Sequence, residues 1–336
     1  RDATQAALLD GAVGVTIGTH ALFQDRVRFQ RLGLIVVDEQ HRFGVQQRLS
    51  LRDKGPEGQA THQLIMSATP IPRTLAQSLY ADLDVSTIDE LPPGRTPVRT
   101  VAIANTRRDD VLARIGEVCA AGRQAYWVCT LVEVSEQLSA QAAEETAALL
   151  REELAHLRVG LVHGRMKADD KDAQMRAFKE GRTQLLVATT VIEVGVDVPN
   201  ATMMVIMDAD RFGVSQLHQL RGRIGRGQYP GLCLLVTSAA PDTPARTRLD
   251  AVASTRDGFR LAELDLAQRH EGNVLGADQS GRSVLSMLRV LDHADVITAA
   301  KDLATRWVSQ DPDDPRLADM VRSTEEMATG DLMEQG

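Results

Sequence analysis

Apolar runs and amphipathic stretches alternate through the middle of this chain, and the alternation restricts the fold more than any other feature of the sequence. Each apolar run is short and rich in valine, isoleucine or leucine, as buried parallel strands are, and each amphipathic stretch is long enough for a crossover helix. The clearest helices are expected at residues 136–157 and at 169–179, where Met175 and Phe178 would be buried. We therefore predict an α/β fold with a doubly wound parallel sheet. Its strands are expected at residues 98–104, 126–130, 159–162, 184–189, 202–207 and 232–237.

Further elements are expected on both sides of this region. Strands are predicted at residues 13–17, 32–37 and 62–66, and helical spacing recurs at 246–252 and 258–268. Residues 89–97 contain three prolines and a glycine, which predicts a stiff connector between two lobes. The chain has 336 residues, of which 43% are hydrophobic, and this is enough to bury two cores.

Two carboxylates follow the apolar run 34–37, where open α/β sheets place their ligands. Asp38 could hold Mg²⁺ through water, and Glu39 could orient or deprotonate a water that attacks a phosphate. A second apolar run leads into Ser67 and Thr69, whose hydroxyl groups could hydrogen-bond the acidic loop. A strand that simply ends in an acidic turn is the alternative.

Arginines and glycines alternate in residues 219–226, and no acidic residue lies between Arg211 and Gly227. The pattern predicts three arginines on one glycine-containing helix. Guanidinium groups stay charged and grip two phosphoryl oxygens at once, and glycine lets the backbone approach a nucleotide closely. The segment therefore indicates phosphate recognition, with a solvated basic helix face as the alternative.

Together these segments resemble motifs II, III and VI of superfamily-2 helicases, and over nearly the whole chain the sequence resembles the RecG family of branched-DNA helicases. Residues 257–281 also resemble the translocation hairpin that RecG shares with the transcription-repair coupling translocase Mfd. Gln40 and the Leu-Pro-Pro-Gly-Arg linker favour RecG of the two. The residues that carry the resemblance are 18–23, 37–44, 66–74, 89–95, 163–166, 188–199, 216–227 and 257–281.

The resemblance implies RecA-like lobes that use ATP and Mg²⁺, with the second lobe closing over a nucleotide bound to the first. Gln219 would contact the γ-phosphate edge, and Arg223 and Arg226 would be arginine fingers, each typically worth about 10³- to 10⁵-fold in rate. Asp197 would lie near the ribose or near a finger, although a helix cap or turn is its alternative role. The residues expected to couple ATP to movement are Gln40, His41, Ser67, Thr69 and Asp197.

The family pattern also implies contacts with branched or forked DNA. For Thr19, His20 and His163 the alternative is an ordinary turn role. Relatives usually carry other residues at the positions of His270 and Asn273. The resemblance identifies no protein partner. The expected DNA contacts are Thr19, His20, His163, Arg165, Thr189, Thr190, Arg269 and Gln279.

Charge and cysteine content restrict how the chain can contact DNA and in which cellular compartment it is expected. The net charge is −8, but residues 308–336 carry −6 of it, so DNA contact must come from local basic patches. This acidic tail could be a disordered segment or a closing helix, and Pro312, Pro315 and Gly330 favour partial disorder. No apolar run approaches the ~20 residues of a membrane span, no signal peptide opens the chain, and three separated cysteines indicate a reduced, cytoplasmic protein.

The dipeptide Gly-Lys of a phosphate-binding loop is missing from the sequence. We therefore expect the C-terminal portion of a RecG-type ATP-dependent helicase, acting on stalled forks and Holliday junctions in recombination and repair and inactive without its phosphate loop and wedge domain. An Mfd-like duplex translocase or a non-catalytic DNA-binding fragment are the alternatives. The expected divisions are 1–94 for part of the first RecA-like lobe, 95–240 for the second lobe, and 241–336 for the translocation hairpin and acidic tail.

Overall fold

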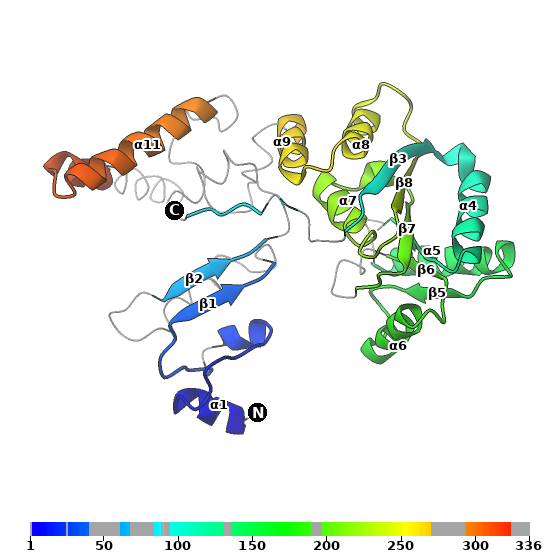
Figure 1. Cartoon of the computed structure of the whole chain (residues 1–336), viewed down its shortest axis with the longest axis horizontal. Helices are drawn as coiled ribbons and strands as arrows, with labels where there is room; N and C mark the ends of the chain where they lie inside the picture. The colour runs from blue at the N-terminus through cyan, green and yellow to red at the C-terminus, as the bar shows by residue number, and fades with distance from the viewer. Residues whose placement is uncertain are drawn as a thin grey trace. The chain divides into compact units, whose positions relative to one another are not determined.

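The computed structural model describes residues 2–24, 26–39, 61–67, 84–88, 90, 95–130, 136–189, 197–269 and 293–323. The chain divides into two compact units, Arg1–Pro70 and Ile71–Gly336 (Figure 1).

The first unit contains a small parallel sheet of two strands. Its elements are α1 (Asp2–Leu9), the short 3-10 helix η1 (His20–Phe23), β1 (Leu34–Val37) and β2 (His62–Ile65). The apolar run of β1 was expected to form a buried strand, and among the described residues it is buried on one face only. Ile35 and Val37 are buried, whereas Leu34 and Val36 are 59% and 55% exposed. Side chains alternate across a strand, so only one face of β1 is covered.

The strand expected at residues 13–17 does not form, since these residues are irregular. Val15 is 82% exposed and Ile17 is 95% exposed. A strand is stable only when its backbone groups pair with a neighbour, and no strand of the described residues pairs with this segment. An apolar run predicts the tendency to form a strand but does not supply the partner.

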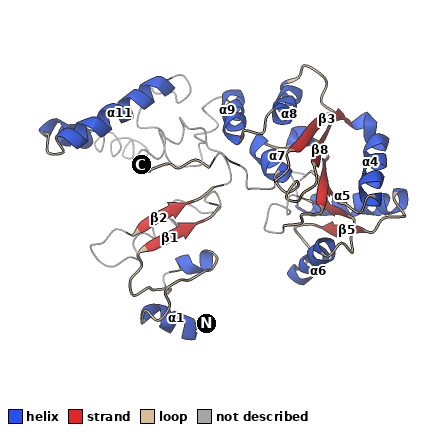
Figure 2. Cartoon of the chain, in the orientation of Figure 1, coloured by secondary structure: helices blue, strands red, loops and turns tan. Residues whose placement is uncertain are grey.

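The second unit is built on a six-stranded parallel sheet with the order β3-β8-β7-β4-β6-β5, which confirms the predicted α/β fold (Figure 2). Valine, leucine and isoleucine fill the central strands because helices cover both faces of such a sheet. The strands are β3 (Val98–Ala104), β4 (Gln124–Val128), β5 (Val159–Val162), β6 (Leu185–Ala188), β7 (Ala201–Ile206) and β8 (Gly231–Thr237).

Strand β4 begins two residues before its predicted start, because a buried amide replaces an apolar side chain there. Gln124 is 2% exposed, and its Nε2 donates to the carbonyls of Phe178 and Thr183 at 2.6 and 2.7 Å. A buried polar group that is fully hydrogen-bonded fits inside a strand, although its polarity suggests a loop.

Helices cover both faces of this sheet. Trp127 of β4 faces the cluster that contains Ile115 and Leu150, whereas its neighbour Tyr126 faces the cluster that contains Phe178 and Leu217. The helices of the first cluster are α4 (Arg108–Ala120) and α5 (Glu136–Glu153). Those of the second are α6 (Ala168–Lys179), α7 (Val214–Arg221), α8 (Pro244–Ser254) and α9 (Gly258–Arg269).

Helix α5 ends at Glu153, four residues before its predicted end. Leu154 and Leu157 are still buried, so the apolar spacing continues into the turn that follows the helix. The spacing therefore predicted the packing of these residues correctly and their conformation incorrectly.

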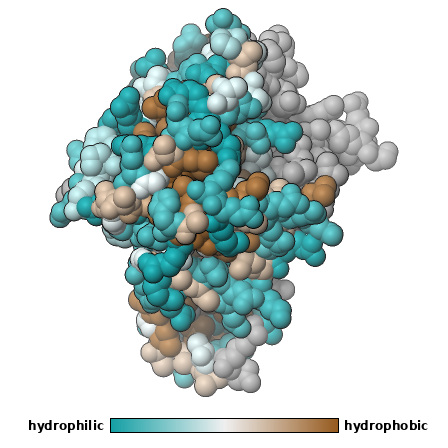
Figure 3. Space-filling view, turned by 90° about the vertical axis from the view of Figure 1, so that its right-hand side faces the viewer, coloured by the Kyte–Doolittle hydropathy of each residue, from teal (hydrophilic) through white to brown (hydrophobic). Residues whose placement is uncertain are grey.

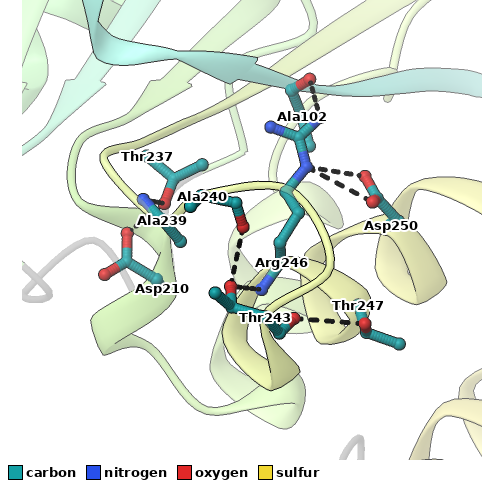
Figure 4. Close-up of polar contacts among 9 residues, drawn as sticks. All are labelled: Ala102, Asp210, Thr237, Ala239, Ala240, Thr243, Arg246, Thr247 and Asp250. Carbon is teal, nitrogen blue, oxygen red and sulfur yellow. Dashed lines mark hydrogen bonds and ion pairs between the residues drawn. The ribbon is translucent and has the colours of Figure 1, made fainter.

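Helix α8 is fixed to the edge of the sheet through its first turn (Figure 4). Thr243 caps the helix by accepting a 3.3 Å bond from the backbone N–H of Arg246. The guanidinium of Arg246 donates to the carbonyl of Ala102 in β3 at 3.0 Å and to Asp250 at 3.1 Å. Close by, the hydroxyl of Thr237 donates to Asp210, so the end of β8 is held to the turn after β7.

The described part of the acidic tail is helical rather than irregular. Helix α11 (Ala294–Gln310) is followed by a turn and by further helical residues at 315–323. The turn is held by Asp314, which accepts a 2.8 Å bond from the indole of Trp307 and a 2.6 Å bond from Arg316. Pro315 lies at the start of the second helical stretch, where its missing N–H costs nothing.

In the part of the chain that the structure describes, no helix is both long and apolar enough to cross a lipid bilayer. On the face drawn in Figure 3, hydrophilic residues predominate and hydrophobic residues form separate patches.

Candidate functional site

The acidic pair lies directly after β1, in a turn of unusual backbone conformation. Glu39 has a φ of 55°, in the left-handed region, and its N–H donates to Oδ1 of Asp38 at 2.9 Å. This conformation costs a residue other than glycine about 1 kcal/mol or more, and such strain is often found at functional sites. The carboxylate of Asp38 is exposed, as a water-mediated contact with Mg²⁺ requires.

The hydroxyl segment follows the neighbouring strand, as the sequence predicted. Val37 pairs with Ile65, and the N–H of Met66 donates to the carbonyl of Val37 at 2.7 Å, so Ser67 and Asp38 lie at the same edge of the sheet. Gln40, His41 and Thr69 lie outside the described residues.

The arginines of residues 219–226 do not share a helix, which corrects the prediction. Helix α7 ends at Arg221, where the N–H of Gly222 closes its last turn on the carbonyl of His218 at 3.0 Å. Gly225 then adopts a φ of +69°, which turns the chain out of the helical path at little cost. Only Arg221 is helical, and the other two arginines lie on the loop that follows.

The side chain of Arg221 is also unavailable to a phosphate, because it is 5% exposed and satisfied within the protein. It donates to the carbonyls of Val252 and Thr255 at 2.8 Å each, and it lies 3.0 Å from Nδ1 of His218.

Arg226 and Asp197 lie side by side. An Nη atom of Arg226 is 3.7 Å from Oδ1 of Asp197, and its Nε donates to the carbonyl of Gly222 at 3.1 Å. Both side chains keep solvent access, with 32% of Arg226 and 58% of Asp197 exposed. Burial raises the pKa of the Tyr126 hydroxyl, and the charges of Arg223 and Arg226 partly offset this rise. The loop therefore concentrates positive charge beside one carboxylate.

Two of the predicted DNA contacts follow neighbouring strands at one edge of the large sheet. His163 comes after β5 and Thr189 after β6, and the N–H of Thr189 donates to the carbonyl of Val162 at 3.2 Å. His163 is 7% exposed, with Nε2 3.2 Å from a carboxylate oxygen of Glu144, and Thr189 is 1% exposed. His163 Nδ1 and Thr189 Oγ1 are buried and have no hydrogen-bond partner among the described residues.

The other predicted DNA contacts are less informative. Arg165 is exposed, and Thr19 caps η1 by accepting a 3.5 Å bond from the N–H of Ala21, which is the turn role weighed for it. Arg269 is the last residue of α9. The side chains of His20 and Arg269, and all of Thr190 and Gln279, lie outside the described residues.

Sequence reasoning assigned no role to two residues that contact this loop and its helix. His218 is half-buried and lies 3.0 Å from the guanidinium of Arg221, and Arg95 donates to the carbonyl of Gly222 at 2.7 Å. The contact of Arg95 leaves no signal in the sequence, since Arg95 and Gly222 are 127 positions apart. His218 and Arg221 are three residues apart, a spacing that places them on one face of a helix.

Comparisons with known proteins agree with these motifs. The family model described as DEAD/DEAH box helicase matches residues 1–78, and the helicase conserved C-terminal domain matches residues 110–228. The ATP-dependent DNA helicase RecG of Mycobacterium tuberculosis (strain ATCC 25618 / H37Rv) is 53% identical over 330 residues, which are 94% of this chain and 45% of the relative. RecG of Escherichia coli (strain K12) is 53% identical over 306 residues, which are 90% of this chain and 44% of the relative. The chain thus spans less than half the length of these curated relatives.

The chain is also similar to solved helicase structures. A structure of RecG bound to a three-way DNA junction has a TM-score of 0.65 and 39% identity, and the match covers 88% of this chain and 37% of that one. Dbp5 of S. cerevisiae, bound to RNA and ADP BeF3, has a TM-score of 0.51 at 15% identity over 74% of this chain and 66% of its own, which shows a shared fold only.

Proposed function

Because the chain belongs to the RecG family of ATP-dependent DNA helicases, we propose that its two α/β units form the motor of an enzyme that hydrolyses ATP and unwinds branched DNA. The proposed substrates are stalled forks and Holliday junctions, and the proposed setting is recombination and DNA repair in the cytoplasm. The observation that carries the proposal is the 53% identity over 94% of this chain. The related RecG structure is bound to a three-way DNA junction, which supports branched DNA as the substrate class.

In this proposal, carboxylates of the first unit and guanidinium groups of the second act on the phosphates of ATP. Asp38 would hold Mg²⁺ through water, and its exposed carboxylate suits an ion that keeps most of its water ligands. Bound Mg²⁺ would neutralise phosphate charge. Glu39 would orient or deprotonate the attacking water, and Gln219, Arg223 and Arg226 would contact the phosphates as charge develops.

Movement would follow from the state of the nucleotide. Gln40, His41, Ser67, Thr69 and Asp197 are the residues proposed to transmit that state. Asp197 is the best supported of them, because it lies 3.7 Å from the guanidinium of Arg226 and competes with a phosphate for it. The proposed DNA contacts are Thr19, His20, His163, Arg165, Thr189, Thr190, Arg269 and Gln279. The divisions at 1–94, 95–240 and 241–336 remain part of the proposal.

We also propose that these 336 residues do not turn over ATP by themselves. The sequence contains no Gly-Lys dipeptide, and a helicase of this class needs a loop of backbone amides and a lysine around the β- and γ-phosphates. An upstream extension that supplies such a loop is expected to restore turnover.

The test measures ATP hydrolysis by the 336-residue chain and by the extended chain, each with forked DNA and with linear duplex. We expect turnover only from the extended chain, and stronger stimulation by the fork than by the duplex. In the extended chain, Arg226→Ala should lower kcat by about 10³-fold or more while ATP binding persists. The control is Arg182→Ala, which removes an exposed arginine paired with Glu180 and should leave kcat unchanged.

Each failure has a distinct meaning. Normal turnover by Arg226→Ala would remove the finger role, and equal stimulation by linear duplex would favour an Mfd-like translocase. Turnover by the 336-residue chain would overturn the proposal that it is inactive alone.

A further inference from the structure

Two arginines from distant parts of the second unit donate to one backbone oxygen. The carbonyl of Gly222 accepts a 2.7 Å bond from an Nη atom of Arg95 and a 3.1 Å bond from Nε of Arg226. A carbonyl oxygen has two lone pairs, so both bonds can form together. Their formation brings two permanent positive charges to the same point.

The balance of charge at this point is unfavourable to Arg95. The pKa of Arg95 is lowered first by burial and then by the charge of Arg226, and Asp197 only partly offsets these effects. Arginine stays protonated in proteins, so the repulsion is not relieved by loss of a proton. It is relieved when one of the two guanidinium groups moves away. Arg95 is half-buried, whereas Arg226 is exposed, so Arg226 is the group with room to move.

The backbone around Arg95 holds the same loop at its other end. The hydroxyl of Thr96 donates to the carbonyl of Tyr229 at 2.7 Å. A Cβ added to Gly225 would lie 2.7 Å from Cγ2 of Val98, and a Cβ added to Gly231 would lie 2.9 Å from the same atom. Residues 95–98 therefore contact the finger loop (residues 222–231) near its start, middle and end.

We propose that Arg95 is a positioning residue for Arg226: it fixes the Gly222 carbonyl and, by like-charge repulsion, makes it easier for Arg226 to leave its resting bond for a phosphate. The inference rests on the proposed finger role of Arg226. Arg95 also lies in the predicted connector between the lobes (residues 89–97), so a change in the connector would reach the finger through this bond. A purely structural role, in which Arg95 only anchors β3, is the rival explanation.

Two substitutions separate charge from hydrogen bonding in the extended, ATPase-competent chain. Arg95→Lys keeps the positive charge and a donor, whereas Arg95→Gln keeps a donor and removes the charge. We expect Arg95→Gln to lower kcat about tenfold with KM for ATP within twofold, and Arg95→Lys to retain at least half of kcat. Arg99→Gln is the control, because this exposed arginine of β3 is a near neighbour in sequence but is not one of the two donors to the Gly222 carbonyl. It should leave kcat unchanged.

A double-mutant cycle identifies the residue through which Arg95 acts. Single-turnover hydrolysis is measured for Arg95→Gln, Arg226→Ala and the double variant. We expect Arg95→Gln to reduce the rate less than twofold once Arg226 is absent. A tenfold reduction in both backgrounds, or the same kcat for Arg95→Gln and Arg95→Lys, would overturn the inference.

Thermal unfolding of the same variants checks for misfolding. Arg95→Gln and Arg95→Lys should have Tm values within a few degrees of each other, and a kcat loss that follows Tm alone would support the rival role instead. If Arg226→Ala itself keeps normal kcat, the proposed function of Arg226 fails. If Arg226→Ala is inactive while Arg95→Gln is fully active, only the present inference fails.

Discussion

The guanidinium group of Arg221 donates a 2.8 Å hydrogen bond to the backbone carbonyl of Val252. Val252 lies in the last turn of α8, where carbonyls have no partner within the helix, and Arg221 also donates to Thr255 just beyond that turn. A buried arginine thus closes the end of α8 and ties it to α7, the helix that precedes the finger loop. Of the three arginines in residues 221–226, Arg221 therefore stabilises the helix next to the finger loop, and its side chain is not available to a phosphate.

Arg221→Ala should therefore act on stability. It leaves two backbone carbonyls without a donor in a buried region and removes charge-assisted bonds, so we expect a loss of about 3 kcal/mol in the free energy of unfolding. Arg221→Lys should recover little, because a single ammonium group does not reproduce the planar fork of donors. Urea unfolding of the chain measures both. Arg182→Ala, at an exposed pair, should change stability by less than about 0.5 kcal/mol.

Gly225→Ala should distort the finger loop. The residue has a φ of +69°, and an added Cβ would lie 2.7 Å from Cγ2 of Val98 and 3.2 Å from the carbonyl of Thr96. Strain and overpacking together should cost about 2 to 3 kcal/mol. Gly122→Ala is the matched control, since Gly122 has a φ of +75° and nothing within 4 Å of the added atom. It should cost only about 1 kcal/mol. If the two variants lost equal stability, the contact with Val98 would carry no weight.

His218 should make the second unit sensitive to acid. Burial, followed by the charges of Arg221 and Arg95, lowers the pKa of its imidazole to about 4, with Asp257 acting in the opposite direction. The unfolded chain binds this proton near pH 6.5, so the native state disfavours it. Stability is thus complete above about pH 6.5 and declines as the pH falls toward the native pKa, by about 2 kcal/mol at pH 5.0.

His218→Gln removes this titration. Unfolding free energies at pH 7.5 and 5.0 should therefore fall less for the variant than for the wild-type chain, by the same ~2 kcal/mol. Equal losses would mean that the imidazole is protonated as readily in the native state as in the unfolded chain.

Much of the large sheet could be predicted because its signals are local. Strands β3 and β5 have the predicted boundaries, and the run Val159–Val162 shows why, since it is apolar and flanked by the polar residues Arg158 and His163. Two of the failures depend on distant partners. Residues 13–17 have a strand-like sequence without a paired strand, and Gln124 enters β4 because the carbonyls of Phe178 and Thr183 satisfy it.

The candidate site shows the same division. Family resemblance pointed to Asp197 and Arg226, which do lie side by side, although their roles remain proposals. It did not separate Arg221 from the two arginines of the loop, because all three lie in one short glycine-containing segment. The structure shows that α7 ends at Arg221 and that Gly225 adopts a positive φ beyond that end. The bond from Arg95 to Gly222 could not be predicted, since hydrogen bonds across 127 positions leave no periodic pattern.

Thr189→Val should separate stability from DNA binding. The Thr189 hydroxyl is buried without a hydrogen-bond partner among the described residues, so the isosteric valine should leave stability unchanged or raise it by about 1 kcal/mol. If the hydroxyl is held for a DNA phosphate, as proposed, the variant should bind forked DNA about tenfold more weakly, equal to ~1.4 kcal/mol. Fluorescence anisotropy at fixed salt measures this change, because phosphate contacts depend on ionic strength.

The chain offers a matched control in Thr100, whose hydroxyl is also buried without a partner in the described structure but lies within β3. Thr100→Val should have a similar effect on stability and none on DNA affinity. Weaker binding by both variants would indicate a general change in the sheet. If Thr189→Val has the expected stability but binds forked DNA with unchanged affinity, the Thr189 hydroxyl does not contact a DNA phosphate. A buried hydroxyl that lowers the stability of the fold and adds no DNA affinity has no role at the proposed interface.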